Sequence, residues 1–175
     1  MKRPTPTSQE RHFQEDELIV SKTDLKGRLT YVNDVFCSVG LYTEAEVLGQ
    51  PHSILRHPDM PRAVFALLWQ RIQDGREVFA FVKNLAKNGD FYWVLAHVTP
   101  SFTLAGEVDG YHSNRRKPHR SALAVIEPVY RELLRIEAAS QDRRVGLRDS
   151  LARLDALLAE NRQGYDEFVL GLATR

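Results

Sequence analysis

The stretch RHPDMPRAVFALLWQRIQDG, residues 56–75, decides the fold prediction. Its second half predicts a helix, because apolar side chains recur at i, i+3, i+4 and i+7, a spacing that gathers them on one helix face. These side chains are Phe65, Leu68, Trp69 and Ile72. Pro61 stands where the first turn begins and Gly75 stands where the pattern ends, as expected for the two ends of a helix.

Short runs of β-forming residues lie on both sides of this helix. Before it, the pattern predicts strands at 17–24 and 27–34 and short helices at 34–39 and 43–49. After it, the pattern predicts three antiparallel strands at 77–84, 90–100 and 108–117. The pair Asn88-Gly89 predicts a type I′ turn between the first two of these, with positive φ at both positions. The order predicts an α+β fold, a five-stranded antiparallel sheet with helices on one face.

Composition divides the chain into three parts. Residues 1–13 are polar with two prolines and predict a disordered lead-in, residues 14–118 form the sheet-containing domain, and residues 119–175 predict a helical extension. In the extension, leucines repeat at 147, 151, 154 and 158, which is too short a seam for a coiled coil. We expect this seam to dock on a partner or a second copy; the alternative is a cap on the domain's own sheet.

Overall composition excludes several classes of protein. The 175 residues are 43% hydrophobic and 27% charged with a net charge of +1, which is typical of a globular protein and not of a general nucleic-acid coat. The single cysteine, Cys37, excludes an internal disulfide and a cysteine metal cluster, and the six histidines lack metal-ligand spacing. No apolar run approaches about 20 residues, so we expect a cytoplasmic protein without membrane insertion. The basic run 115–117 is expected to be a solvated strand end.

Several stretches carry a resemblance to a known family. They are TDLKGRLTYVND, YTEAEVLGQPH, RHPDMPRAVF, VKN followed by KNGDFYWV, and the GY-S-R pattern of the last strand. Together they resemble a PAS sensory domain, and more narrowly the FAD-binding PAS domain of bacterial aerotaxis receptors, over residues 17–134. The resemblance implies non-covalent FAD, with FMN as the less favoured flavin, and implies that Asn33, Trp69 and Asn84 fall on ligand-contacting positions.

The residues themselves suit the parts of a flavin. Phe65 and Trp69 can form an apolar slot for its ring, and the Asn84 amide can pair with the mixed donor and acceptor edge of that ring. The alternative interpretation makes the two aromatic side chains ordinary core residues. For Asn84, the alternative is a residue beside a turn that bonds only to backbone.

Arg56, His57 and Asp59 form the most concentrated polar cluster. Arg56 offers a planar fork for a phosphate group, and Asp59 could orient either Arg56 or His57. The alternative is a surface loop held by an internal arginine–aspartate pair. A catalytic interpretation of His57 and Asp59 is disfavoured, because no nucleophile stands at a recognisable spacing.

The sequence also departs from flavin-binding PAS relatives. Blue-light PAS proteins carry a cysteine after a Gly-x-Asn, whereas residues 49–52 read GQPH here and Cys37 lies elsewhere, so adduct-forming photochemistry is not expected. In the last strand, alternation places His112 and Asn114 on the face opposite Ser113 and Arg115.

The leading hypothesis is a cytoplasmic sensor of redox state or oxygen that holds FAD and relays its state to a protein partner in a chemotaxis or signalling pathway. A homodimer is a second possible assembly. The alternative hypothesis is a cofactor-free PAS module for interaction or dimerisation. We predict that the protein is not an enzyme, because no substrate cavity beside the flavin slot and no acid–base pair can be named.

Overall fold

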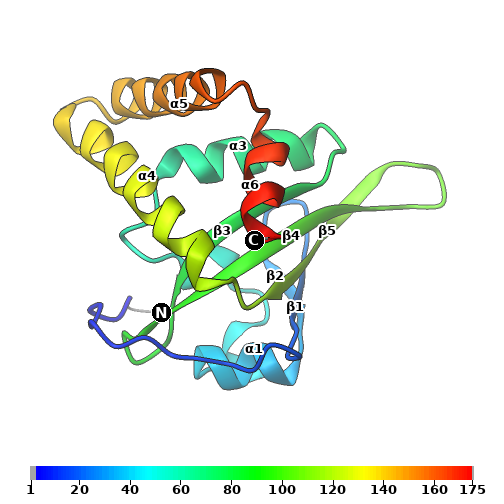
Figure 1. The fold of residues 1–175 in the computed structure, drawn as a ribbon. Coiled ribbons are helices and arrows are strands. Elements are labelled where there is room, and N and C mark those ends of the chain that lie inside the picture. The colour runs from blue at the N-terminus through cyan, green and yellow to red at the C-terminus, as the bar shows by residue number, and fades with distance from the viewer. Residues whose placement is uncertain (1–2, 175) are drawn as a thin grey trace.

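Five strands form one antiparallel sheet in the order β2-β1-β5-β4-β3 (Figure 1). The computed structural model describes residues 3–174, and its strands are β1 (Ile19–Thr23), β2 (Leu29–Val32), β3 (Val78–Leu85), β4 (Phe91–Phe102) and β5 (Val108–Arg116). The predicted α+β class and five-stranded antiparallel sheet are confirmed. The single sheet has two faces, and different helices cover each of them.

The helices between β2 and β3 cover the face that we call the inner face, which bears Val82, Ala96 and Ser113. They are α1 (Asp34–Gly40), α2 (Glu44–Val47), the 3-10 helix η1 (His52–Leu55) and α3 (Arg62–Gln73). Local signals explain where they begin. Thr43 precedes α2, and its backbone N–H donates to the Glu46 carboxylate (2.9 Å) in a capping box.

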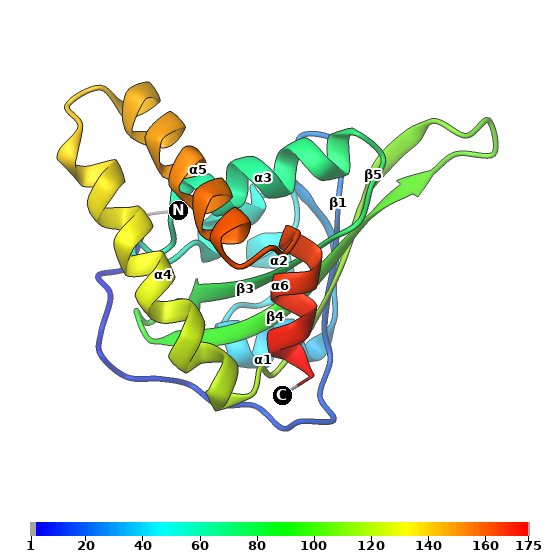
Figure 2. The ribbon, with the colours of Figure 1, turned by 45° about the horizontal axis from the view of Figure 1, so that its top comes forward.

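The C-terminal helices cover the opposite, outer face, where α4 and α6 lie against β3 and β4 (Figure 2). They are α4 (Arg120–Ala139), α5 (Arg143–Glu160) and α6 (Tyr165–Ala173). The hydroxyl of Tyr130 donates to the carbonyl oxygen of Phe81 (2.7 Å), and the Tyr130 ring lies 6.2 Å from that of Trp93. Four apolar residues on one side of α4 are buried: Leu123, Ile126, Tyr130 and Leu133. Pro128 lies inside this helix, which continues on both sides of it.

The helices α4 and α5 form a hairpin that reaches past the sheet toward α3. Gly146 in α5 permits a close approach, because a Cβ there would stand 2.9 Å from the carbonyl oxygen of Glu137. Within the leucine seam, Leu154 is buried by its own chain and the other three side chains are half-buried. Docking of the seam on a partner or a second copy therefore stays a prediction.

The structure corrects the expected disordered lead-in. Residues 3–13 run extended beside the start of β4, where the N–H of Thr7 donates to the carbonyl of Gly89 (2.8 Å) and the N–H of Arg11 to that of Phe91 (2.7 Å). Phe13 is buried in the core. These bonds and this burial offset the loss of chain entropy, and no local sequence pattern reveals them. Residues 1 and 2 lie outside the described part of the chain.

The turn between β3 and β4 also differs from the prediction. Gly89 has a φ of +98°, but Asn88 is not among the described residues with positive φ, so the turn is not type I′. The reason is length, because residues 86–90 separate the two strands and a type I′ hairpin uses two. Gly89 is also required by packing, since a Cβ there would collide with the carbonyl oxygen of Thr5.

The edge of the sheet at β3 is covered along part of its length. The N–H of Lys83 donates to the sulfur of Met60 (3.2 Å), and the carbonyl of Lys83 accepts from the N–H of His57 (3.4 Å). Two residues earlier, the carbonyl oxygen of Phe81 accepts a hydrogen bond from the Tyr130 hydroxyl. Residues 56–60 and α4 thus occupy outward backbone groups of this edge strand. Among residues 3–174, the structure contains no helix long and apolar enough to cross a membrane.

Candidate functional site

A cavity of about 460 Å³ lies between α3 and the inner face of the sheet. This volume falls within the range of small-molecule sites in proteins. One wall is the apolar face predicted for α3, since all four of its side chains line the cavity: Phe65, Leu68, Trp69 and Ile72. The opposite wall comes from alternate residues of β3 and β4, among them Val82, Ala96 and Val98. The sheet and α3 therefore enclose an apolar slot.

Trp69 stands at one end of this slot in a defined position. Its six-membered ring lies so close to Gly27 that a Cβ there would be 3.0 Å from a ring atom, and Gly27 has a φ of +73° that glycine tolerates. The ring also meets Tyr111 edge-on, with 5.6 Å between ring centroids. The indole is thus held while it lines the cavity.

The deep end of the cavity holds a buried cation, Arg115, which is 2% exposed. Its Nε donates to the hydroxyl of Ser113 (3.0 Å), and its Nη2 donates to the hydroxyl of Ser21 and to Nε2 of His52 (2.7 Å). Burial lowers the pKa of Arg115 to about 10, so the guanidinium stays charged at neutral pH. Burial and the nearby Arg115 charge lower the pKa of His52 to about 3, so His52 is neutral and can accept this bond.

Two buried donors of cavity-lining residues have no hydrogen-bond partner among the described residues. They are Nη1 of Arg115 and the amide nitrogen of Asn84, a side chain that is 3% exposed. The hydroxyl of the buried Tyr92, which is outside the lining, also has no partner. An unsatisfied buried donor costs about 1–3 kcal/mol. A ligand that presents oxygen or nitrogen acceptors here would remove that cost.

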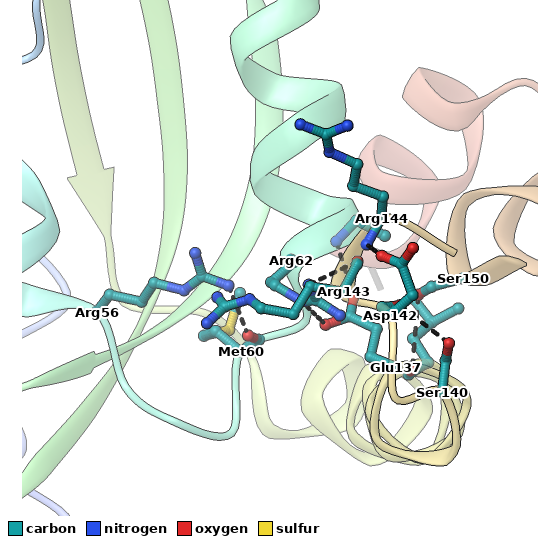
Figure 3. A network of polar contacts seen from close by, with 11 residues as sticks. Arg56, Met60, Arg62, Glu137, Ser140, Asp142, Arg143, Arg144 and Ser150 are labelled. Carbon is teal, nitrogen blue, oxygen red and sulfur yellow. Dashed lines mark hydrogen bonds and ion pairs between the residues drawn. The ribbon is translucent and has the colours of Figure 1, made fainter. Parts of the chain in front are cut away.

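Two further arginines line the cavity from the residues around the start of α3 (Figure 3). Arg56 packs its guanidinium over the Phe65 ring (4.3 Å to the centroid) and donates to the carbonyl oxygen of Met60 (3.2 Å). Desolvation by burial lowers the pKa of Arg56. Arg62 is engaged with the C-terminal helices, since its Nε donates to the Glu137 carboxylate (2.9 Å) and its Nη1 to the carbonyl of Arg143 (2.8 Å).

The structure brings together four of the seven predicted site residues. Arg56, Phe65, Trp69 and Asn84 line the cavity. Asn33 does not line it, because its side chain serves the backbone. Its oxygen accepts from the N–H groups of Val20 and Phe36, and its amide donates to the carbonyl of Leu18.

His57 and Asp59 also lie outside the cavity lining. His57 is buried, and its Nδ1 accepts from the N–H of Asp59 (3.1 Å). Desolvation, followed by repulsion from Lys83, lowers the pKa of His57 to about 4. The Asp59 carboxylate pairs with Lys83 (2.7 Å). The alternative of a loop held by an internal arginine–aspartate pair is not what forms either, because the cation that pairs with Asp59 is Lys83 of β3.

The sequence interpretation missed several cavity residues: Ser21, His52, Arg62, Ser113 and Arg115. The expectation that residues 115–117 form a solvated strand end is wrong for Arg115, because its side chain points to the inner face. A usable signal did exist. Alternation in β5 separates Ser113 and Arg115 from His112 and Asn114, and the structure places only the first pair in the cavity lining.

Comparison with known proteins agrees with this architecture. The family model described as the PAS fold matches residues 19–112, which is more than half of the chain. The chain belongs to the PAS family. This PAS chain is 41% identical over 130 residues to the aerotaxis receptor of Escherichia coli (strain K12), an alignment that covers 74% of this chain and 26% of the receptor. It is 29% identical over 97 residues to the nitrogen fixation regulatory protein of Klebsiella pneumoniae, covering 55% of this chain and 20% of that protein.

Solved structures support the same fold. The light state of the Aureochrome1 LOV photoreceptor aligns with a TM-score of 0.57 at 17% identity, covering 61% of this chain and 86% of that one. A Light-Oxygen-Voltage domain studied with a flavin analogue aligns with a TM-score of 0.56 at 19% identity, covering 66% and 87%. At such identities the likeness shows the fold alone. The chain spans about a quarter of the aerotaxis receptor's length (26%), so the activity of that whole receptor does not follow from the match.

Proposed function

We propose that this PAS chain binds a flavin non-covalently in the inner-face cavity and senses redox state or oxygen in the cytoplasm. The observation that carries the proposal is the pairing of an apolar slot with buried donors that lack acceptors among the described residues. An isoalloxazine ring is flat and apolar on its faces, and it carries carbonyl oxygens and ring nitrogens on one edge.

Each part of the cavity has a counterpart in the cofactor. Phe65 and Trp69 would pack on the ring, while Asn84 and Arg115 would donate to its polar edge. A bound flavin would supply reversible uptake of electrons, and the chain's residues would bind and orient it. Trp69 is already fixed by Gly27 and Tyr111, so little side-chain ordering is needed on binding.

The mouth of the cavity favours FAD over FMN in this proposal. Arg56 and Arg62 both line the cavity, and guanidinium groups suit phosphate oxygens. Arg62 is already bonded to Glu137 and to the carbonyl of Arg143, so a phosphate would share this cation with Glu137. Arg56 has no carboxylate partner among the described ion pairs, which leaves its fork available. A diphosphate distributes its two charges over two phosphate groups and could contact both arginines, whereas the phosphate of FMN concentrates its charge on one group.

A relay to the C-terminal helices would pass through the cavity wall α3. Glu137 of α4 accepts from the Arg62 guanidinium through one oxygen and from the N–H of Ala63 through the other (3.0 Å), so it caps the first turn of α3 (Figure 3). At the other end of α3, Arg71 pairs with Asp166 of α6 (2.5 Å). A shift of α3 on ligand reduction would therefore reach both helices of the outer face.

The proposed output is contact with a protein partner in a signalling pathway, with self-association through the C-terminal helices as a second route. The chain's role would be sensing and not catalysis. The competing candidate is a cofactor-free PAS interaction module, in which the same cavity would serve only packing.

The absorbance spectrum of the purified full chain tests the proposal. We expect flavin bands, either as purified or after addition of FAD, and tighter binding of FAD than of FMN. Asn84→Leu should lower flavin affinity at least tenfold. Asn114→Leu is the matched control, because it removes the same side chain from a β5 position outside the cavity lining. Absence of flavin bands after reconstitution with FAD and with FMN would favour the cofactor-free module.

A further inference from the structure

Arg115 is a charged side chain in the core whose described hydrogen-bond partners are all neutral. Its guanidinium contacts two hydroxyls, of Ser21 and Ser113, and one imidazole, of His52. The ion pairs found among the described residues do not include it. A buried charge is costly unless it is paired, so this arrangement calls for an explanation.

The groups around Arg115 do not supply a negative charge. Tyr92 on β4 is buried, and desolvation raises its pKa to about 12, so its phenol stays neutral at neutral pH. On the side of α1, the guanidinium lies over the Phe36 ring, 5.6 Å from its centroid. His52 on η1 is neutral as well. Strands β1, β4 and β5 and helices α1 and η1 thus surround the cation with hydroxyls, an imidazole and aromatic rings.

The geometry of the cluster keeps the cation aimed at the cavity. Ser21 and Ser113 are neighbours across the β1–β5 ladder, and they hold Nη2 and Nε of Arg115 from one side. This leaves Nη1 without an acceptor among the described residues while the residue lines the cavity. A ligand in the cavity could supply the acceptor that Nη1 lacks.

We infer that Arg115 selects the charge of the ligand, so that the cavity prefers a ligand whose inner edge is anionic and holds the more negative of two ligand states more tightly. Where the ligand is a flavin, this inference rests on the proposed function. Addition of two electrons and one proton to an oxidised flavin leaves one negative charge on the ring. Arg115 then binds the reduced ring more tightly than the oxidised ring and raises its midpoint potential.

The test compares Arg115→Met and Arg115→Lys with the adjacent control Arg116→Met, which alters an exposed arginine. The first measurement is thermal unfolding of the full chain without flavin. Because the Arg115→Met change removes an unpaired buried charge, we expect a melting temperature at or above that of the unaltered chain. A lower melting temperature in Arg115→Met that is absent in Arg115→Lys would make Arg115 a structural brace and overturn the inference.

The second measurement is a reductive titration with dithionite of each variant reconstituted with FAD. For Arg115→Met we expect the ratio of affinities for reduced and oxidised flavin to fall at least tenfold, which lowers the midpoint potential by about 30 mV for a two-electron couple. Arg115→Lys should stay within about threefold of the unaltered chain, because it keeps the positive charge, and Arg116→Met should not change the ratio.

An unchanged potential in Arg115→Met overturns the inference even where flavin binds. If the unaltered chain binds no flavin, the proposed function fails, and the flavin-free unfolding measurement still decides whether the cation is unpaired.

Discussion

The inner and outer faces of the sheet differ in how they are packed and in whether their buried polar groups have partners. On the inner face, α3 stands off the strands and encloses a cavity lined by donors without acceptors among the described residues, those of Asn84 and Arg115. On the outer face, α4 lies directly on the strands, and its buried polar groups have partners. The Tyr130 hydroxyl bonds to Phe81, and Glu137 bonds to α3 through both carboxylate oxygens.

This difference indicates where the free energy of folding comes from. Packed apolar contacts and satisfied hydrogen bonds stabilise the folded chain, and beneath α4 the two occur together, at Leu133 and Tyr130. The inner face retains an unpaired charge and a cavity, each of which lowers stability until a ligand is bound. The helices outside the region matched by the family model thus stabilise the fold that carries the site.

The largest expected effect is a difference in the stability lost when a side chain is truncated on the outer face or on the inner face. Leu133→Ala removes a fully buried side chain of α4 and should lower the free energy of unfolding by about 2–5 kcal/mol. Phe65→Ala removes a half-buried side chain that lines the cavity, so it should lower the free energy of unfolding by less than Leu133→Ala does. Urea unfolding of the flavin-free chain measures both. Equal losses would mean that the cavity wall is as tightly packed as the outer face.

The next largest expected effect is a loss of folding stability on acidification, caused by His52 and His57. His52 and His57 have pKa values lowered to about 3 and about 4, each mainly by burial, whereas an unfolded histidine titrates near 6.5. Between these values the unfolded chain binds more protons, so stability falls as pH drops from about 6.5 toward 4, by up to about 1.4 kcal/mol per pH unit for each histidine.

Urea midpoints at several pH values between about 7 and 4.5 check this expectation. His52→Gln should flatten the pH dependence, and substitution of the exposed His119 by Gln should leave it unchanged. A His52→Gln chain with the same slope as the unaltered chain would show that this histidine titrates normally in the fold.

The smallest effect concerns a single hydrogen bond of the outer face. Tyr130→Phe keeps the ring beside Trp93 and removes the donor to the Phe81 carbonyl, so it should destabilise the chain by about 1 kcal/mol. Tyr31→Phe is the control, because that side chain is 43% exposed and has no described hydrogen bond. Thermal or urea unfolding would detect the difference, and equal stabilities would mean that water replaces the lost donor.

The sequence predicted the parts of the site that depend on local periodicity. The helical spacing from Phe65 to Ile72 identified the face of α3 that lines the cavity, and strand alternation grouped Ser113 with Arg115. Both are short-range regularities that hold wherever the element is placed. The position of Asn84 at the end of an apolar strand could be predicted for the same reason.

Partners supplied by distant segments were not predictable. Arg115 sits in a basic run and looks solvated until the fold sets Ser21 and His52 beside it. Asp59 pairs with Lys83 from β3, and no spacing within its own loop reveals that partner. The lead-in prediction fails for the same reason, since the hydrogen bonds of that segment go to a turn and strand far along the chain, at Gly89 and Phe91.

The covered edge of β3 has a consequence for assembly. An exposed edge strand invites another chain to add a strand, and this is a common start of aggregation. Here Tyr130 and the residues around Met60 occupy the outward groups of Phe81 and Lys83, so a second molecule cannot add a strand along this part of β3. Loss of α4, by proteolysis or by truncation near residue 118, would open a template for fibril growth at the Phe81 end of the strand. The C-terminal helices therefore also protect part of the sheet edge from pairing with another chain.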